Sequence, residues 1–188
     1  KDDHPDIISA KQHNIPLIHR SDLLKTLLKE KQALLVTGAH GKTSTSALLS
    51  WVLESSGLKP TYAIGGILQN LKKNGGFGLG SHFVAEADES DGSFLGYLGD
   101  GAIITNVGKE HLDHWKTESN IIEGFKKFIS QVKDSSRLFW CADDPILQKI
   151  HPRGVSYGKK GMLCLKASRQ IGVSMVFSAA FKGKTYYD

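Results

Sequence analysis

The chain has 188 residues, of which 40% are hydrophobic and 23% charged, with a formal net charge of +5. This composition is typical of a globular domain with a substantial core and excludes a low-complexity or fibrous chain. No apolar run reaches the roughly 18 residues of a membrane span, so we expect no membrane partner. The lysines are scattered along the chain, and the sequence contains no zinc pattern or basic helix, so we expect no nucleic-acid partner. Cys141 and Cys164 are distant in sequence and predict reduced, buried thiols.

The N-terminal stretch up to Arg20 predicts a short strand and a connection, with its apolar residues at 7–8 and 15–18. Ser21 or Asp22 can cap the helix that follows. Four leucines share one face of that helix, at the spacing of Leu23, Leu24, Leu27 and Leu28. A buried strand over 32–37 comes next.

The segment from 34 to 44 reads Leu-Leu-Val-Thr-Gly-Ala-His-Gly-Lys-Thr-Ser, an apolar strand running into a glycine turn and then a helix pattern. Backbone N–H groups of such a turn and helix start face an anion, so the sequence predicts a phosphate site. Lys42 would supply charge to the outer phosphates, and Thr43 a hydroxyl to bound Mg²⁺. The turn between Gly38 and Gly41 is shorter than the general phosphate-loop pattern, so an ordinary strand-to-helix turn with a solvent-facing lysine is the alternative.

Strands and helices alternate over the middle of the chain, which predicts an α/β fold with a mainly parallel sheet flanked by helices. Ligands of such sheets collect at the carboxyl ends of the strands, where the phosphate loop also lies. The expected elements after the 42–56 helix are a strand at 61–64, a glycine-rich loop at 74–80, strands at 82–87 and 102–106, a helix at 118–132, a strand at 138–142, a short helix after Pro145, and a small antiparallel or edge region at 155–187.

Four carboxylates lie at the end of the apolar strand over 82–87: Glu86 in the strand itself, and three acids directly after it. Anions this close repel one another unless a cation or strong donors hold them, and hard oxygen ligands of this kind suit Mg²⁺. Glu86 lies deepest in the strand and is the expected ligand, while Asp88, Glu89 and Asp91 would position substrate or support the site. An acidic surface loop, in which Ser90 and Asp91 cap a helix, is the alternative.

A third polar segment, residues 103–115, follows another strand end and contains Asn106, His111 and His114. His111 could ligate a second metal or contact the γ-phosphate. A structural zinc site is not expected, because no further His or Cys ligands lie nearby. For His114 a structural role is the favoured interpretation.

These motifs resemble those of one family. Gly38-Ala39-His40-Gly41-Lys42-Thr43-Ser44 is similar to the ATP loop of the Mur ligases, commonly written Gly-Thr-His-Gly-Lys-Thr-Thr. Residues 86–95 and 105–114 resemble the next two motifs of the member that joins L-alanine to UDP-N-acetylmuramate. Ala39 replaces the usual threonine, and the segment 107–110 replaces a more acidic lead-in to the histidine.

The resemblance implies a cytoplasmic, ATP- and Mg²⁺-dependent ligase of peptidoglycan synthesis. The γ-phosphate would pass to the lactyl carboxylate of UDP-N-acetylmuramate, and the amine of L-alanine would attack the acyl phosphate. The implied catalytic residues are Lys42, Glu86 and His111, and the implied metal ligands are Thr43, Glu86 and His111. The loop 38–44 would bind ATP. The implied substrate contacts are His40, Asp88, Glu89, Ser90 and Asn106.

The resemblance also implies a division into domains. Residues 1–31 would be the end of the N-terminal UDP-binding domain with a linker helix, and residues 32–188 an incomplete central ATP-binding domain. The chain begins without methionine and would lack the C-terminal domain, so we expect the fragment to be inactive alone. Two alternatives remain: a recycling ligase that adds a preformed tripeptide, which usually has tyrosine where Ser90 stands, and a non-catalytic nucleotide-binding module.

Overall fold

The structure is a computed structural model that describes residues 3–187. The helices are α1 (Pro5–Gln12), α2 (Arg20–Leu28), α3 (Lys42–Ser55), α4 (Leu112–Trp115), α5 (Glu118–Ser130) and α6 (Pro145–Ile150), with short 3₁₀ turns at Ser93–Gly96 and Ser135–Arg137. The strands are β1 (Gln32–Thr37), β2 (Thr61–Leu68), β3 (Lys73–Gly76), β4 (His82–Glu86), β5 (Gly101–Ile104), β6 (Leu138–Cys141), β7 (Val155–Gly158), β8 (Leu163–Ile171), β9 (Ser174–Phe181) and β10 (Lys184–Tyr187).

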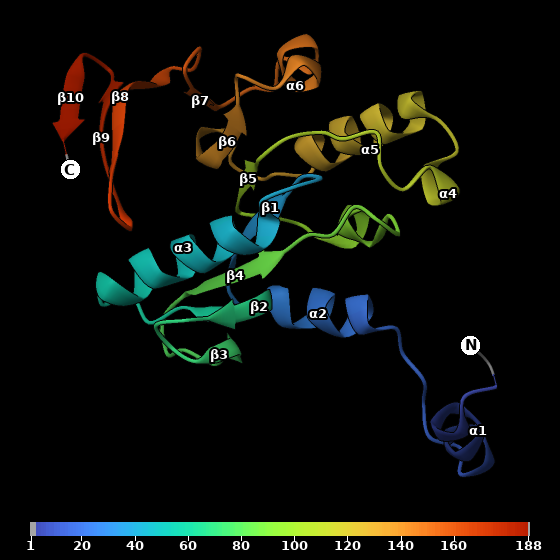
Figure 1. Cartoon of the computed structure of the whole chain (residues 1–188). Helices are drawn as coiled ribbons and strands as arrows, with labels where there is room; N and C mark the ends of the chain where they lie inside the picture. The colour runs from blue at the N-terminus through green and yellow to red at the C-terminus, as the bar shows by residue number, and fades with distance from the viewer. Residues whose placement is uncertain (1–2, 188) are drawn as a thin grey trace.

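Within residues 3–187, ten strands form one sheet in the order β10-β9-β8-β7-β6-β5-β1-β4-β2-β3 (Figure 1). The pairs from β2 through β4, β1, β5, β6 and β7 to β8 are parallel, and β3, β9 and β10 add antiparallel edges. The predicted mainly parallel α/β fold is confirmed. Val36 of β1 pairs with both Glu86 and Ile103, so β4, β1 and β5 end side by side.

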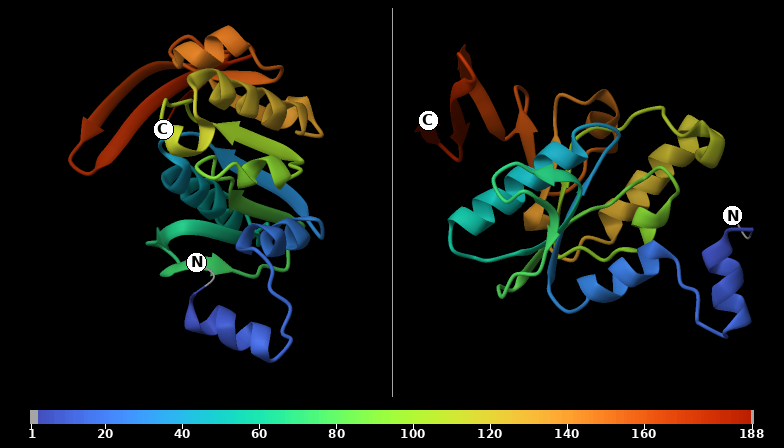
Figure 2. Two further views of the ribbon diagram at one scale, coloured as in Figure 1. Left: turned by 90° about the vertical axis from the view of Figure 1, so that its right-hand side faces the viewer. Right: turned by 60° about the horizontal axis from the view of Figure 1, so that its bottom comes forward.

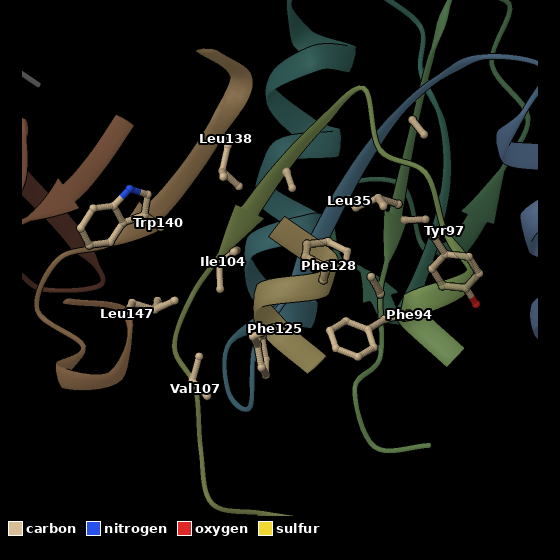
Figure 3. Close-up of a cluster of buried hydrophobic side chains, with 14 of the residues drawn as sticks. Leu35, Phe94, Tyr97, Ile104, Val107, Phe125, Phe128, Leu138, Trp140 and Leu147 are labelled. Carbon is tan, nitrogen blue, oxygen red and sulfur yellow. The ribbon is translucent and has the colours of Figure 1, made fainter. Parts of the chain in front are cut away.

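Side chains that alternate along β4 supply a hydrophobic core on each face of the sheet. Phe83 and Ala85 belong to one cluster, and Val84 belongs to the other, where Leu49 and Leu53 of α3 cover it. On the first face α5 packs Phe125 and Phe128 against residues of β1 and β5, and Phe94 stacks on Phe128 and meets Phe125 edge to face (Figure 3). Covered on both faces, the central strands hold their carboxyl ends rigidly in place.

The helix α5 follows directly from its sequence pattern. Ile121, Phe125 and Phe128 are separated by four and three residues and lie on one buried face. The hydroxyl of Thr117 accepts a hydrogen bond from the backbone N–H of Asn120 and caps the first turn. The predicted helix over 118–132 is therefore confirmed to within two residues at its end.

Two local predictions were wrong. The expected short strand near Ile7 is the helix α1, which starts with Pro5 after His4, whose imidazole accepts a hydrogen bond from Asp6 N–H. The expected glycine-rich loop over 74–80 begins only after residue 76, because residues 74–76 belong to β3, which pairs antiparallel with β2. Figure 2 shows α1 standing away from the sheet at the end of an extended segment, and none of its residues is buried.

The C-terminal region only partly follows the expected antiparallel pattern. The strand β7 continues the parallel sheet beside β6, and the antiparallel part consists of β8, β9 and β10. Figure 2 shows this ribbon projecting from the body of the sheet. Cys141 and Cys164 are free thiols, as expected, but they are half-buried rather than fully buried. No helix within residues 3–187 is long and apolar enough to span a lipid bilayer.

Candidate nucleotide-binding site

The phosphate loop joins β1 to α3 through two glycines with positive φ. Gly38 has φ +133° and Gly41, which precedes the first residue of α3, has φ +82°. No side chain caps this helix, and the N–H groups of its first turn have no intrahelical acceptors. These N–H groups and the positive end of the helix dipole form a site for an anion such as a nucleotide phosphate.

The segment after β5 braces the phosphate loop. Asn106 holds the backbone of His40 at both polar groups: its Oδ1 accepts from the His40 N–H at 2.9 Å, and its Nδ2 donates to the carbonyl at 2.9 Å. The Thr105 hydroxyl donates to the same carbonyl at 2.6 Å. The structure thus places Asn106, implied above as a substrate contact, in support of the loop, while the exposed His40 imidazole lies 3.3 Å from a Glu110 oxygen.

Replacing Asn106 by alanine is expected to raise the Kd for a nucleotide at this loop by roughly tenfold. Two hydrogen bonds to a solvent-accessible backbone segment are together worth about 1–2 kcal/mol, which corresponds to that factor. Calorimetric titration with ADP measures the change, and Asn70→Ala in an exposed turn is the control. An unchanged Kd in Asn106→Ala would show that the loop keeps its shape without the amide.

Lys42 points back beneath the loop instead of into solvent. Its ammonium donates to the Gly38 carbonyl at 2.8 Å and to Glu89 Oε2 at 2.8 Å, and Asp88 Oδ1 lies 3.7 Å away. The Lys42 side chain is 15% exposed. The alternative of a solvent-facing lysine is therefore wrong, and the charge of Lys42 lies under the site for phosphate.

Glu86 links the start of α3 to the end of β4 and the middle of β2. Its carboxylate accepts from the hydroxyls of Thr43 and Ser46, each at 3.2 Å, and from the Gly65 N–H at 2.7 Å. Sequence reasoning paired Thr43 with Glu86 but missed Ser46 and Gly65. The position of Ser46, one helical turn after Lys42, was the available signal for the first of these.

The pairing of Thr43 with Glu86 fits a magnesium ion bound beside a nucleotide. A hydroxyl and one carboxylate are donors that Mg²⁺ accepts when phosphate oxygens and water complete its shell. Within residues 3–187 no group of three or more His, Cys, Asp or Glu side chains could hold a metal by itself. A metal at this place would therefore depend on the nucleotide for its remaining ligands.

The acidic loop after β4 is anchored by hydrogen bonds of its own. Asp88 Oδ1 accepts from Ser90 N–H at 3.1 Å, and Asp91 Oδ1 accepts from Ser93 N–H at 2.9 Å. Hydrogen bonds from Ser93 stabilise the charged carboxylate and hold the pKa of Asp91 below its ordinary value. Asp88 and Asp91 thus shape the loop, and Asp88 also faces Lys42.

His111 reaches the same place from the segment after β5. Its backbone adopts φ +58°, and its Nε2 lies 3.9 Å from Glu89 Oε1. The Trp115 indole donates to the Glu89 carbonyl at 2.9 Å and ties this segment to the acidic loop. The structure therefore brings the expected catalytic residues Lys42, Glu86 and His111 to one end of the sheet.

Comparison with known proteins identifies the family. Residues 36–178 match the Mur ligase middle domain. The chain belongs to the Mur ligase family.

Individual Mur ligases can be aligned with most of the chain. It is 43% identical to the UDP-N-acetylmuramate–L-alanine ligase of Protochlamydia amoebophila over 159 residues, which are 84% of this chain and 35% of the relative. The enzyme of the same name from Aquifex aeolicus is 40% identical over 98% of this chain and 42% of its own length. The crystal structure of UDP-N-acetylmuramate-alanine ligase from Thermotoga maritima superposes with a TM-score of 0.87 at 28% identity, over 99% of this chain and 43% of that one. This Mur ligase chain thus spans about 35–43% of the length of these proteins.

The two departures from the usual Mur ligase motifs touch each other. Ala39 stands in the phosphate loop, and Gly108 lies in the segment before His111. A Cβ atom placed on Gly108 would lie 2.6 Å from the Cβ of Ala39, so no side chain fits there without a shift. The two loops are in direct contact through their smallest residues.

A cavity of about 350 Å³ opens beside Glu86, between α2 and the sheet. Its wall combines leucines of α2 with polar groups near the acidic loop, namely Arg20, Leu23, Leu24, Leu27, Ala63, Ile64, Gly65, Glu86, Asp88, Ser93 and Tyr97. Burial raises the pKa of the Tyr97 phenol, so this group stays a neutral hydrogen-bonding partner at ordinary pH. The cavity gives this Mur ligase chain room for a second ligand next to the Thr43–Glu86 pair.

Proposed function

We propose that the full-length protein is an ATP-dependent ligase that joins L-alanine to UDP-N-acetylmuramate. The observation that carries the proposal is the convergence of Lys42, the Thr43–Glu86 pair and His111 at the carboxyl ends of three adjacent strands. The names and the roughly 40% identity of the relatives support the choice of substrates. The chain spans less than half of the length of each of these relatives.

In the proposed reaction the phosphates of ATP lie on the first turn of α3, and Lys42 offers positive charge from beneath the loop. Thr43 and Glu86 would hold Mg²⁺, which supplies charge neutralisation for the phosphates when bound. The loop N–H groups and Lys42 are fixed in place before the nucleotide arrives. Their contribution is positioning and electrostatic stabilisation of the phosphoryl group in transfer.

The reaction would proceed in two steps. A lactyl carboxylate oxygen of UDP-N-acetylmuramate bonds to the γ-phosphorus while the bond to ADP breaks. The amine of L-alanine then bonds to the acyl carbon, the bond from that carbon to the phosphoryl-bearing oxygen breaks, inorganic phosphate leaves with that oxygen, and the nitrogen gives its proton to the phosphate or to water. His111 would contact the acyl phosphate, and the cavity beside Glu86 lies where the carboxylate could approach.

The full-length protein provides the test. It is incubated with ATP, Mg²⁺ and UDP-N-acetylmuramate together with one amine donor at a time, and phosphate release is measured. Turnover with L-alanine and none with the L-Ala-γ-D-Glu-meso-diaminopimelate tripeptide supports the proposal. Turnover with the tripeptide alone assigns the recycling reaction instead. Nucleotide binding without turnover with either donor assigns a non-catalytic module.

We also propose the domain division stated above, with 1–31 as the end of a UDP-binding domain and 32–188 as part of the central domain. Under this division the chain alone lacks groups that hold UDP-N-acetylmuramate and the amino acid. Purified residues 1–188 are therefore expected to give no phosphate release under conditions in which the full-length protein turns over. Activity from the fragment would contradict the division.

A further inference from the structure

Glu89 stands out because it is a charged side chain inside the protein. It is 3% exposed, and it is the one charged residue among the buried polar side chains of the described part of the chain. An isolated buried carboxylate costs several kcal/mol, so such a group is kept only where something compensates it. The groups that contact the Glu89 side chain therefore indicate its function.

The two oxygens of Glu89 face different functional segments. Oε2 accepts from the Lys42 ammonium at 2.8 Å. Oε1 is buried and has no hydrogen-bond partner, and His111 Nε2 lies 3.9 Å from it. The backbone carbonyl of Glu89 accepts from the Trp115 indole in the same segment as His111. One residue thus connects the phosphate loop, the acidic loop and the histidine segment.

The geometry leaves Lys42 with a donor to spare. An ammonium has three N–H donors, and the Gly38 carbonyl and Glu89 Oε2 occupy two of them, while Asp88 Oδ1, at 3.7 Å, is too far away to accept the third. Because two hydrogen bonds fix the ammonium of this flexible side chain, the direction of its third N–H is fixed as well. Direct binding of a phosphate or a substrate carboxylate by Glu89 is disfavoured, since both would be anions and the side chain is closed off from solvent.

We propose that Glu89 is a positioning residue: Oε2 holds the ammonium of Lys42, and the charge of Oε1, 3.9 Å from His111 Nε2, orients the imidazole, so that both groups face the same transferred phosphoryl group. The inference rests on the proposed function. It gives Glu89 a role different from the substrate contact that the resemblance implies. Because Glu89 acts through Lys42, its loss should affect the transition state more than the binding of nucleotide.

The test compares Glu89→Gln and Glu89→Asp with the wild type in the full-length protein. Glutamine keeps the shape and removes the charge, and aspartate keeps the charge but shortens the reach by one methylene. Glu123→Gln is the matched control, because Glu123 pairs with Lys126 at 2.8 Å on the exposed side of α5. The measurements are Tm, the Kd for ADP, and kcat and KM for ATP.

We expect kcat to fall about 10- to 100-fold in Glu89→Gln and less in Glu89→Asp, as for loss of an oriented electrostatic contact. The Kd for ADP should change by less than threefold, because the loop N–H groups that hold the phosphates remain. Glu123→Gln should behave as the wild type. An unchanged kcat in both Glu89 variants would overturn the proposal, and so would a loss of folding in both.

A second readout separates this inference from the proposed function. Acetic anhydride is reacted with each full-length variant in limiting amount, and the acetylation of Lys42 relative to Lys109, an exposed lysine paired with Glu118, is measured by mass spectrometry. Lys42 should react several times faster in Glu89→Gln than in the wild type, because its anchor is gone. Equal rates would overturn the positioning role even if the protein catalysed another reaction. Absence of wild-type turnover with L-alanine, combined with faster labelling, would reject only the proposed function.

Discussion

Replacing Lys42 by alanine in the full-length protein should reduce kcat/KM by roughly 10²–10³-fold, the usual effect of removing a preorganised electrostatic contact at a reacting group. The same change should destabilise the fold, because it leaves Glu89 buried without its 2.8 Å partner. Breaking a buried ion pair from one side costs on the order of 3 kcal/mol. Lys42 therefore serves both the chemistry and the stability of the loop.

A double variant distinguishes the two effects. Lys42→Ala/Glu89→Gln removes the stranded charge, so its Tm should recover towards that of the wild type while its activity stays low. Lys126→Ala, which breaks the exposed pair with Glu123, is the control and should change neither quantity much. Wild-type rates from Lys42→Ala would refute the assignment of the phosphate loop. A double variant no more stable than the single one would refute the burial argument.

Gly38→Ala should abolish nucleotide binding and lower Tm by more than any other single methyl addition in the loop. The added Cβ would lie 2.1 Å from the Thr105 hydroxyl oxygen and 2.8 Å from the Asn106 carbonyl oxygen, and φ at this residue is +133°. The backbone carbonyl cannot yield as a flexible side chain would. The loop must therefore move away from the segment after β5, which spoils the alignment of its N–H groups.

The matched control is Gly57→Ala at the end of α3. Gly57 also has positive φ, at +76°, but a Cβ there would meet nothing within 4 Å. This variant should lose only about 1–2 kcal/mol of folding stability, which is the cost of a side chain at positive φ, and it should bind ADP normally. Calorimetric titration with ADP and thermal unfolding measure both variants. Equal losses in the two would show that backbone conformation alone, without steric contact, explains the effect at Gly38.

Local patterns were sufficient to predict the central sheet and the place of the site. Apolar runs flanked by helical patterns predicted β1, β4 and β5, and polar residues after each of them predicted a shared site, because parallel strands end at one edge. Lys42, Thr43 and Glu86 meet there as the sequence suggested. This reasoning needed only strand direction and the chemistry of the residue types.

Features set by distant contacts could not be predicted in this way. The strand β3 is glycine-rich and exists because β2 offers it an edge, which no local propensity encodes. The helix α1 is a different case, because none of its residues is buried: its proline favours a helix start, but its cap is a histidine and its apolar spacing does not indicate a helix. Nothing local separates Glu89 from its acidic neighbours, since its burial is created by Lys42, His111 and Trp115 from two other segments.

The contact between Ala39 and Gly108 also limits which segments of this protein can be exchanged with those of a relative. Threonine introduced at position 39 would add two atoms to the Cβ that already lies only 2.6 Å from where a Cβ on Gly108 would stand. A chimaera that takes its phosphate loop from another ligase would meet the same obstacle unless it took the histidine segment from that donor as well. The two loops therefore form one exchangeable unit, and the boundaries of any graft should enclose both.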